Sequence, residues 1–185
     1  MIHIILVDGF EEIEALATAD ILRRAGLEVS TVSANASLQA NGAHGIAVTC
    51  DCMLQDADLD ASLLVVLPGG MPGALNLRKS TALCDALQRR AAEGKLIAAI
   101  CAAPYILGEL GLLKGRRATC YPGFEDKLHG ATCTGAGVEH DGNIITGRGP
   151  AAAIDFALKL AEITAGAQKA REVALGMLCT VAEEA

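Results

Sequence analysis

Residues 96–113 read LIAAICAAPYILGELGLL, in which an apolar pentapeptide continues into a helix-like segment and Cys101 lies between the two. A proline, two glycines and a glutamate interrupt the apolar run. A membrane span needs roughly 20 mainly apolar residues, so this stretch does not fit one. It predicts a buried strand that leads directly into a helix.

Outward from this junction, short apolar runs alternate with amphipathic segments. This alternation is typical of an α/β protein with a mostly parallel sheet and helices on both faces. The chain shows no repeat or linker, so a single domain over residues 1–185 is expected. The predicted strands are 2–7, 27–34, 45–50, 62–67, 96–100 and 117–121, and a hairpin is predicted over 138–147 around Asp141-Gly142. The predicted helices are 11–26, 74–94, 103–113, 150–165 and 167–180.

The helix expected at 11–26 has an apolar stripe and ends at Gly26. Residues three and four positions apart share one face of a helix. The residues predicted to form its buried face are Ile13, Leu16, Ala17, Ile21 and Leu22.

Composition excludes several classes of protein. The chain has 22 acidic and 15 basic residues, and its basic residues form no cluster larger than a doublet, which argues against nucleic-acid binding. No basic segment precedes the first apolar run, so we expect no signal or transit peptide, no membrane attachment and a cytoplasmic protein. Seven cysteines, an odd number, do not indicate a disulfide framework there. Cys50-x-Cys52 has no second ligand pair, so no metal site is expected.

Cys101 follows a predicted strand at the sheet edge where open α/β folds bind ligands. A nucleophile on a sharp strand-to-helix turn needs small neighbours, and Ala99 and Ala103 meet that need. The start of the following helix favours a thiolate. The alternative is that Cys101 is an inert, small buried hydrophobe.

Two other predicted loops end at the same edge, in VDGFEE (7–12) and LPGGMPG (67–73). Gly69 and Gly70 offer unobstructed N–H groups for an oxyanion, although P-G-G is also a common turn former. Glu14 is a candidate proton carrier if it faces Cys101, whereas Glu11 and Glu12 are interpreted as complementing the helix dipole. None of the four histidines is placed to pair with Cys101.

Taken in order, GFEEIEA, ILRRAGLEV, VVLPGGMPGALNL, GKLIAAICAAP, EDKL and ITGRGPAAAIDFAL resemble the ThiJ/PfpI family, most closely its parkinsonism-associated deglycase branch. The resemblance covers nearly the whole chain. It implies a flavodoxin-like, three-layer α/β sandwich that forms a homodimer.

By motif matching, the resemblance implies that Cys101 is the nucleophile and Glu14 the protonated carboxyl beside it. It also implies backbone donors at Gly69, Gly70 and Ala102, a position near the dimer interface for Asp20 and Arg24, and a pocket lined by Arg148, Gly149 and Pro150. Tyr121 stands where the parkinsonism-associated protein has a histidine, and His44 where close relatives often have an arginine. Ala102 replaces the histidine of the protease and chaperone branches, which disfavours a Cys-His protease triad.

The resemblance therefore implies processing of 2-oxoaldehydes in carbonyl-stress defence, of the glutathione-independent glyoxalase or deglycase type. The expected partner is a small reactive carbonyl compound, and no metal or organic cofactor is required. A thiol that senses oxidants, a chaperone, and an α/β binding domain with an inert cysteine remain the alternatives.

Overall fold

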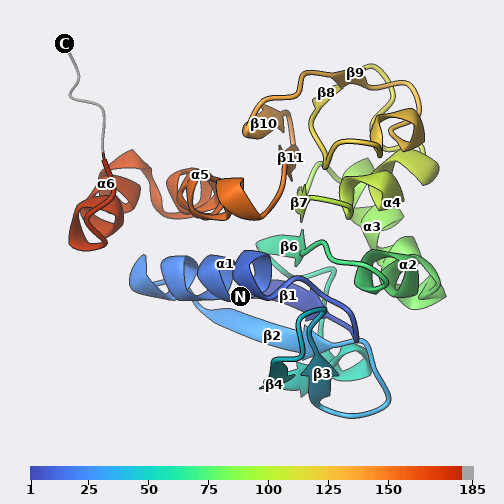
Figure 1. The fold of residues 1–185 in the computed structure, drawn as a ribbon, viewed down its shortest axis with the longest axis horizontal. Helices are drawn as coiled ribbons and strands as arrows, with labels where there is room; N and C mark the ends of the chain where they lie inside the picture. The colour runs from blue at the N-terminus through green and yellow to red at the C-terminus, as the bar shows by residue number, and fades with distance from the viewer. Residues whose placement is uncertain (181–185) are drawn as a thin grey trace.

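The computed structural model describes residues 1–180 and is built on a seven-stranded sheet with the order β10-β11-β7-β6-β1-β2-β5 (Figure 1). Neighbouring strands are parallel except for the antiparallel pair β10 and β11. The sheet consists of β1 (Ile2–Leu6), β2 (Val29–Ser33), β5 (Cys52–Met53), β6 (Leu64–Leu67), β7 (Leu96–Ile100), β10 (Val138–Asp141) and β11 (Ile144–Gly147). The predicted mostly parallel sheet and the hairpin at 138–147 are thereby confirmed. The last five residues of the predicted domain, 181–185, lie outside the described residues.

Helices cover both faces of the sheet (Figure 1). On one face α1 (Glu12–Arg24) packs against α5 (Ala153–Ala165), which packs against α6 (Ala167–Gly176). On the other face lie α2 (Gly73–Arg78), α3 (Thr81–Ala92) and α4 (Pro104–Glu109). Three short 3-10 helices complete the helical elements of residues 1–180: η1 (Leu54–Asp56), η2 (Glu125–Lys127) and η3 (Pro150–Ala152). This arrangement is the predicted three-layer α/β sandwich.

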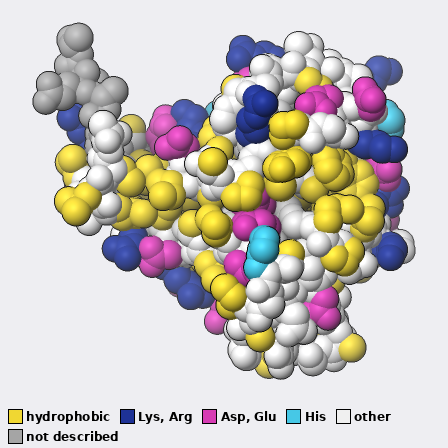
Figure 2. All heavy atoms as spheres, in the orientation of Figure 1, with side chains coloured by type: hydrophobic (Ala, Val, Ile, Leu, Met, Phe, Trp, Pro, Cys, Tyr) yellow, Lys and Arg dark blue, Asp and Glu magenta, His cyan; other side chains and the backbone are white. Residues whose placement is uncertain are grey.

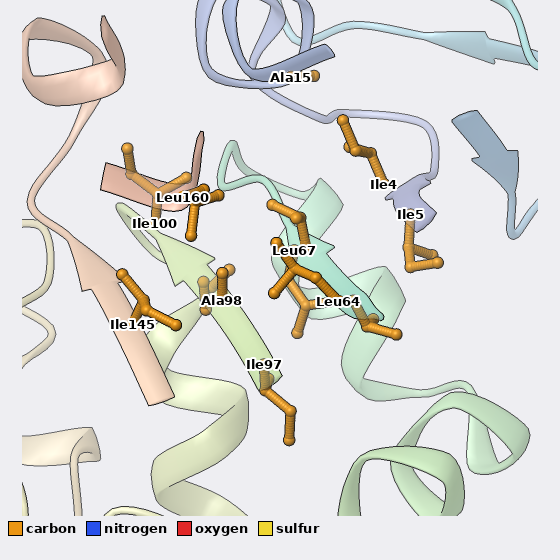
Figure 3. Close-up of a cluster of buried hydrophobic side chains, with 14 of the residues drawn as sticks. Ile4, Ile5, Ala15, Leu64, Leu67, Ile97, Ala98, Ile100, Ile145 and Leu160 are labelled. Carbon is orange, nitrogen blue, oxygen red and sulfur yellow. The ribbon is translucent and has the colours of Figure 1, made fainter. Parts of the chain in front are cut away.

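The core lies on both sides of the central strands, because a strand directs successive side chains to opposite faces. Figure 3 shows Ile4 of β1 directed toward Ala15 of α1, while Ile5 points to the opposite side. All of β1 and β6 is buried. Apolar runs without polar alternation therefore form the central strands, as buried parallel strands require.

Two predicted strands do not join this sheet. Within residues 45–50, β4 (Ala47–Thr49) instead pairs with β3 (Gln39–Asn41) in an antiparallel hairpin. This hairpin packs on the loop between β1 and α1, where Phe10 pairs with Gly42. Within residues 117–121, only β8 (Arg117–Ala118) is a strand, and it pairs with β9 (Thr132–Cys133) in a separate small sheet.

The long helix predicted over residues 74–94 is divided into α2 and α3. Ser80 is the N-cap of α3, and its side chain accepts a hydrogen bond from the N–H of Leu83 at 3.4 Å. A serine in this role has extended backbone and ends the preceding helix. The prediction of one continuous helix was therefore wrong.

The buried face of α1 also differs from the prediction. Ile21 and Leu22 are buried as expected, but Ile13 is 57% exposed and Leu16 is 37% exposed. The buried face instead includes Glu12, Glu14, Ala15 and Thr18. The helix directs Glu12 and Glu14 toward the loops at the sheet edge, whereas Ile13 and Leu16 remain exposed in the single chain. Among residues 1–180 no helix has the length and apolar character needed to cross a membrane.

Candidate active site

Cys101 occupies a sharp turn between the end of β7 at Ile100 and the start of α4 at Pro104. Its φ is +64°, a left-handed conformation that is uncommon for a residue other than glycine. Backbone hydrogen bonds hold the turn: Cys101 donates to the carbonyl of Gly147 at 2.9 Å, its own carbonyl accepts from Tyr121 at 2.8 Å, and Ala103 donates to Ile100 at 3.0 Å. The sequence motif thus becomes a strained elbow that presents the thiol at the sheet edge.

Glu14 brings a carboxyl from the first turns of α1 to this thiol. The side chain is fully buried, and its Oε2 accepts a hydrogen bond from the N–H of Gly69 at 2.8 Å. A Cβ atom added at Gly69 would lie 2.8 Å from this Oε2 and 2.6 Å from the Cβ of Cys101, so the carboxyl lies beside the elbow, while Oε1 has no hydrogen-bond partner in the described structure. Glu11 is the N-cap of the same helix and accepts from the N–H of Glu14 at 2.7 Å. The capped helix start therefore positions Glu14 against Cys101.

Burial controls the electrostatics of this pair. Burial raises the pKa of Glu14 from 4.5 to about 7, against the lowering effect of its bonds to Gly69 and Cys101. Burial and then the negative charge of Glu14 raise the pKa of Cys101 from 9.0 to about 12, against the N–H groups of Gly70 and Ala102. The predicted stabilisation of the thiolate by the following helix does not dominate, and α4 has only six residues. A proton on Glu14 removes the charge that opposes the thiolate, so the two groups act as one coupled pair.

Positions 69 and 70 require glycine, because other segments of the chain lie too close to Gly69 and Gly70 to leave room for a side chain. At Gly70 the φ is +91°, and a Cβ atom would lie 2.4 Å from the carbonyl oxygen of Gly9. A Cβ at Gly69 would lie 2.6 Å from the Cβ of Cys101. The absence of side chains therefore lets the loop after β6 approach both the elbow and the loop after β1.

His44 lies beside the site on the β3–β4 hairpin and binds Glu12. Its Nδ1 lies 2.7 Å from Glu12 Oε2, and its N–H donates to Oε1 at 2.7 Å. The hydrogen bond to Glu12 raises the pKa of His44. Donor atoms of Glu11, Glu12 and His44 lie within 4.8 Å of one another, but both oxygens of Glu12 already accept hydrogen bonds. Sequence reasoning missed this role of Glu12, because its partner is far along the chain.

The remaining predicted residues do not surround the thiol in the single chain. Asp20 and Arg24 form an ion pair of 2.6 Å on the surface of α1, with both side chains about half exposed. Tyr121, Arg148 and Pro150 line a surface hollow whose lining does not include Cys101. All seven cysteines are free thiols in the described structure.

The fold and the site together define a flavodoxin-like α/β protein whose elbow cysteine contacts a buried carboxyl. The DJ-1/PfpI family model matches residues 1–163, and the chain belongs to this family.

Similar proteins agree with this assignment. The chain is 39% identical to "Protein dj-1beta" of Drosophila melanogaster over 95% of each chain. It is 32% identical to "Glutathione-independent glyoxalase DJR-1.2" of Caenorhabditis elegans, over 91% of this chain and 90% of that protein. The solved structure of oxidized Toxoplasma gondii DJ-1 superimposes with a TM-score of 0.93 at 36% identity and covers 97% of this chain and 98% of its own. The chain spans less than half the length of two matching Arabidopsis thaliana proteins, DJ-1 homologs A and B.

Proposed function

We propose that the protein converts 2-oxoaldehydes to 2-hydroxy acids without glutathione, using Cys101 as the nucleophile. The observation that carries the proposal is the position of the buried Glu14 carboxyl beside the elbow: a Cβ atom added at Gly69 would lie 2.6 Å from Cys101 Cβ and 2.8 Å from Glu14 Oε2. A relative named as a glutathione-independent glyoxalase adds support. The proposed setting is defence against reactive carbonyl compounds in the cytoplasm, and the same attack on a carbonyl would serve removal of early glycation adducts.

The reaction begins when the Cys101 sulfur attacks the aldehyde carbon of the substrate. The thiol gives its proton to the ionised Glu14 carboxyl, a carbon–sulfur bond forms as the carbonyl π bond breaks, and Glu14 passes the proton to the aldehyde oxygen to give a hemithioacetal. The N–H groups of Gly70 and Ala102 stabilise the oxyanion that develops during the attack. Glu14 has a pKa of about 7, so it is able both to donate and to accept a proton near neutral pH.

Glu14 then removes the proton from the former aldehyde carbon and returns it to the neighbouring ketone carbon. The hydroxyl proton on the first carbon moves to the ketone oxygen, so that the first carbon is oxidised to a thioester and the second is reduced to a hydroxyl-bearing carbon. Water attacks the thioester, releases the hydroxy acid and restores the thiol. Every atom and electron is accounted for by substrate and water, so the sequence of steps needs no external oxidant or reductant.

The direct test measures lactate formed from methylglyoxal in the absence of glutathione. The unaltered protein is expected to turn over many substrate molecules per chain. Cys101→Ser should abolish lactate formation, and Glu14→Gln should lower kcat by roughly 10²–10⁴-fold because the proton carrier is lost. Cys133→Ser, at an exposed cysteine, is the matched control and should keep full activity. Consumption of only about one methylglyoxal per thiol, without lactate, would refute the enzyme.

A second candidate function, oxidant sensing, is favoured by one observation. The Oε1 atom of Glu14 is buried without a hydrogen-bond partner in the described structure. A protonated carboxyl there is suited to donate a hydrogen bond to an oxygen atom added to the sulfur of Cys101. A sensor would consume one or two equivalents of peroxide per chain and show no turnover of methylglyoxal, and mass spectrometry of Cys101 would distinguish it from the enzyme.

A further inference from the structure

The β3–β4 hairpin folds around the carboxylate of Glu12. Glu12 Oε1 accepts hydrogen bonds from the N–H groups of His44 at 2.7 Å and of Ile46 at 3.4 Å. Glu12 Oε2 lies 2.7 Å from His44 Nδ1. A Cβ atom added at Gly42 would overlap the same carboxylate, so the hairpin backbone passes directly against it. Because Glu12 is buried, the hairpin takes the place of water around its charge.

These hydrogen bonds keep Glu12 ionised. Burial raises the pKa of this carboxyl, but the hydrogen bonds from the His44 side chain and from the hairpin backbone lower it further, so that the net pKa lies below the ordinary value of 4.5. Glu12 is therefore a carboxylate at neutral pH, and its hydrogen bonds to the hairpin are charge-assisted. Bonds of this kind are about twice as strong as those between neutral groups. Loss of the carboxylate should therefore loosen the hairpin.

The hairpin is also bound to the loop that precedes α1. The N–H of Gly9 donates to the carbonyl of Asn41 at 2.7 Å, and the N–H of Ala43 donates to the carbonyl of Phe10 at 2.8 Å. Phe10 is itself buried. The hairpin therefore covers the loop after β1 and the first turn of α1 together.

This loop leads directly to Glu14. Glu12 lies two residues before Glu14 on α1, and Glu11 caps the helix by accepting a hydrogen bond from the N–H of Glu14 at 2.7 Å. The N–H of Glu11 donates to the carbonyl of Gly69, and a Cβ atom there would meet both Glu14 and Cys101. The titratable groups that act on Glu14 are Glu11, on its own helix, and Cys101, on the elbow. A displaced hairpin would shift this helix start and admit water to the fully buried Glu14.

We infer that Glu12 is a positioning residue of the proposed reaction: it holds the β3–β4 hairpin on the start of α1, and the hairpin in turn keeps Glu14 beside Cys101 and out of contact with water. The effect on turnover rests on the proposed function. Glu12 itself binds the hairpin and not the elbow, so it acts on the reaction through Glu14.

The test measures lactate formation from methylglyoxal as a function of pH. For the unaltered protein, kcat/KM should rise with pH through about 7, because the attack needs an ionised Glu14. In Glu12→Ala the pH of half-maximal kcat/KM should fall below 7, because hydration of Glu14 removes the cause of its raised pKa. The kcat should also fall, by up to roughly 100-fold if Glu14 is misplaced by about 1 Å. Glu12→Gln keeps an oxygen acceptor for the hairpin and should restore most of this activity.

Glu139→Ala is the matched control. The Glu139 side chain is 8% exposed and pairs with Arg117, which is 67% exposed, whereas the Glu12 side chain is 5% exposed and pairs with His44, which is 70% exposed. Glu139 lies on β10, at the edge of the main sheet. Its loss should lower stability without moving the pH of half-maximal kcat/KM. An unmoved value in Glu12→Ala, or an equal movement in Glu139→Ala, would overturn the inference.

A second measurement does not depend on turnover. Alkylation of Cys101 by iodoacetamide at pH 8, followed by mass spectrometry, should be several-fold faster in Glu12→Ala, because access of water lowers the pKa of a thiol that burial raises to about 12. His44→Ala keeps the backbone N–H groups and should change the rate in the same direction by less, which tests the inference if Glu12→Ala does not fold.

The two measurements separate the inference from the enzyme. Faster alkylation of Cys101 in Glu12→Ala, without lactate from the unaltered protein, would uphold the positioning of Glu14 and refute the enzyme. Lactate formation, with an alkylation rate that neither Glu12→Ala nor His44→Ala changes, would overturn the inference and leave the enzyme standing.

Discussion

The carboxyl of Glu14 lies in the protein interior, where a negative charge is costly, and its pKa rises from 4.5 to about 7. The same burial, together with the charge of Glu14, raises the pKa of the Cys101 thiol to about 12. Neither group ionises easily while the other is charged. At the residue scale, the two groups therefore titrate as a pair, and substitution of either residue changes the pKa of the other.

This coupling predicts a pH-dependent stability difference between the unaltered protein and Glu14→Gln. The raised pKa of folded Glu14 means that its favourable contribution is fully present below pH 4.5 and is lost as the pH rises through about 7. Relative to Glu14→Gln, the free energy of unfolding of the unaltered protein should fall by about 3 kcal/mol between pH 4.5 and pH 8.

Urea denaturation at several pH values measures this difference. Glu172→Gln, at an exposed position on α6, serves as the control and should show no comparable trend. A difference between Glu14→Gln and the unaltered protein that stays constant over this pH range would contradict the raised pKa.

At the scale of elements, the site is assembled from three strand-to-helix connections. The turn after β7 presents Cys101, the start of α1 presents Glu14, and the glycine loop after β6 lies between them. The N–H of Glu11 donates to the carbonyl of Gly69 at 3.0 Å, and the N–H of Gly73 donates to that of Gly9 at 3.1 Å. The loops therefore support one another, and a change in one displaces the others.

Two glycines allow a matched test of this packing. Gly70 and Gly26 both have positive φ, +91° and +77°, but only Gly70 has backbone atoms within 4 Å of an added Cβ. Gly26→Ala should cost about 1 kcal/mol of unfolding free energy from backbone strain alone. Gly70→Ala should cost about 3 kcal/mol, because strain and overpacking add, and should also abolish lactate formation. Chemical denaturation of both variants checks this, and equal costs would show that the loop contacts tolerate a side chain.

At the scale of the whole molecule, one face carries apolar side chains that the chain itself does not cover. Figure 2 shows hydrophobic side chains gathered over α1, α5 and α6. Ile13 of α1 is 57% exposed, and Leu175 of α6 is 56% exposed. Exposed apolar patches of this kind mark association surfaces. We propose that this face forms the interface of a homodimer, with the ion pair of Asp20 and Arg24 at its border.

Sedimentation equilibrium tests the homodimer. The unaltered protein is expected to sediment at twice the chain mass of 19.0 kDa at micromolar concentration. Ile13→Glu should shift the protein to the monomer, because it places a charge in an apolar interface. Leu63→Glu introduces the same charge at an exposed leucine just before β6, outside α1, α5 and α6, and should leave the dimer intact. A monomeric unaltered protein would refute the proposal.

Local sequence patterns determined the parts of the fold that depend on neighbouring residues. Apolar runs indicated the central strands, Asp141-Gly142 indicated the hairpin, and a cysteine between small residues indicated the elbow. These features are encoded in strand periodicity, turn preference and side-chain size, which act over a few residues. Serine is also a typical helix N-cap residue, but helical patterns both precede and follow Ser80, so one continuous helix was predicted there.

Tertiary structure alone decided which distant groups meet. It brought Glu14 to Cys101 and His44 to Glu12, it placed residues 47–49 in a hairpin outside the main sheet, and it left Ile13 exposed. Periodicity places a residue on one face of its own helix or strand, but it carries no information about which partner that face meets. Burial and charge at the site arise from packing between segments far apart in the chain, and so the sequence indicated that Glu14 lies beside Cys101 only through the family resemblance and not through its local pattern.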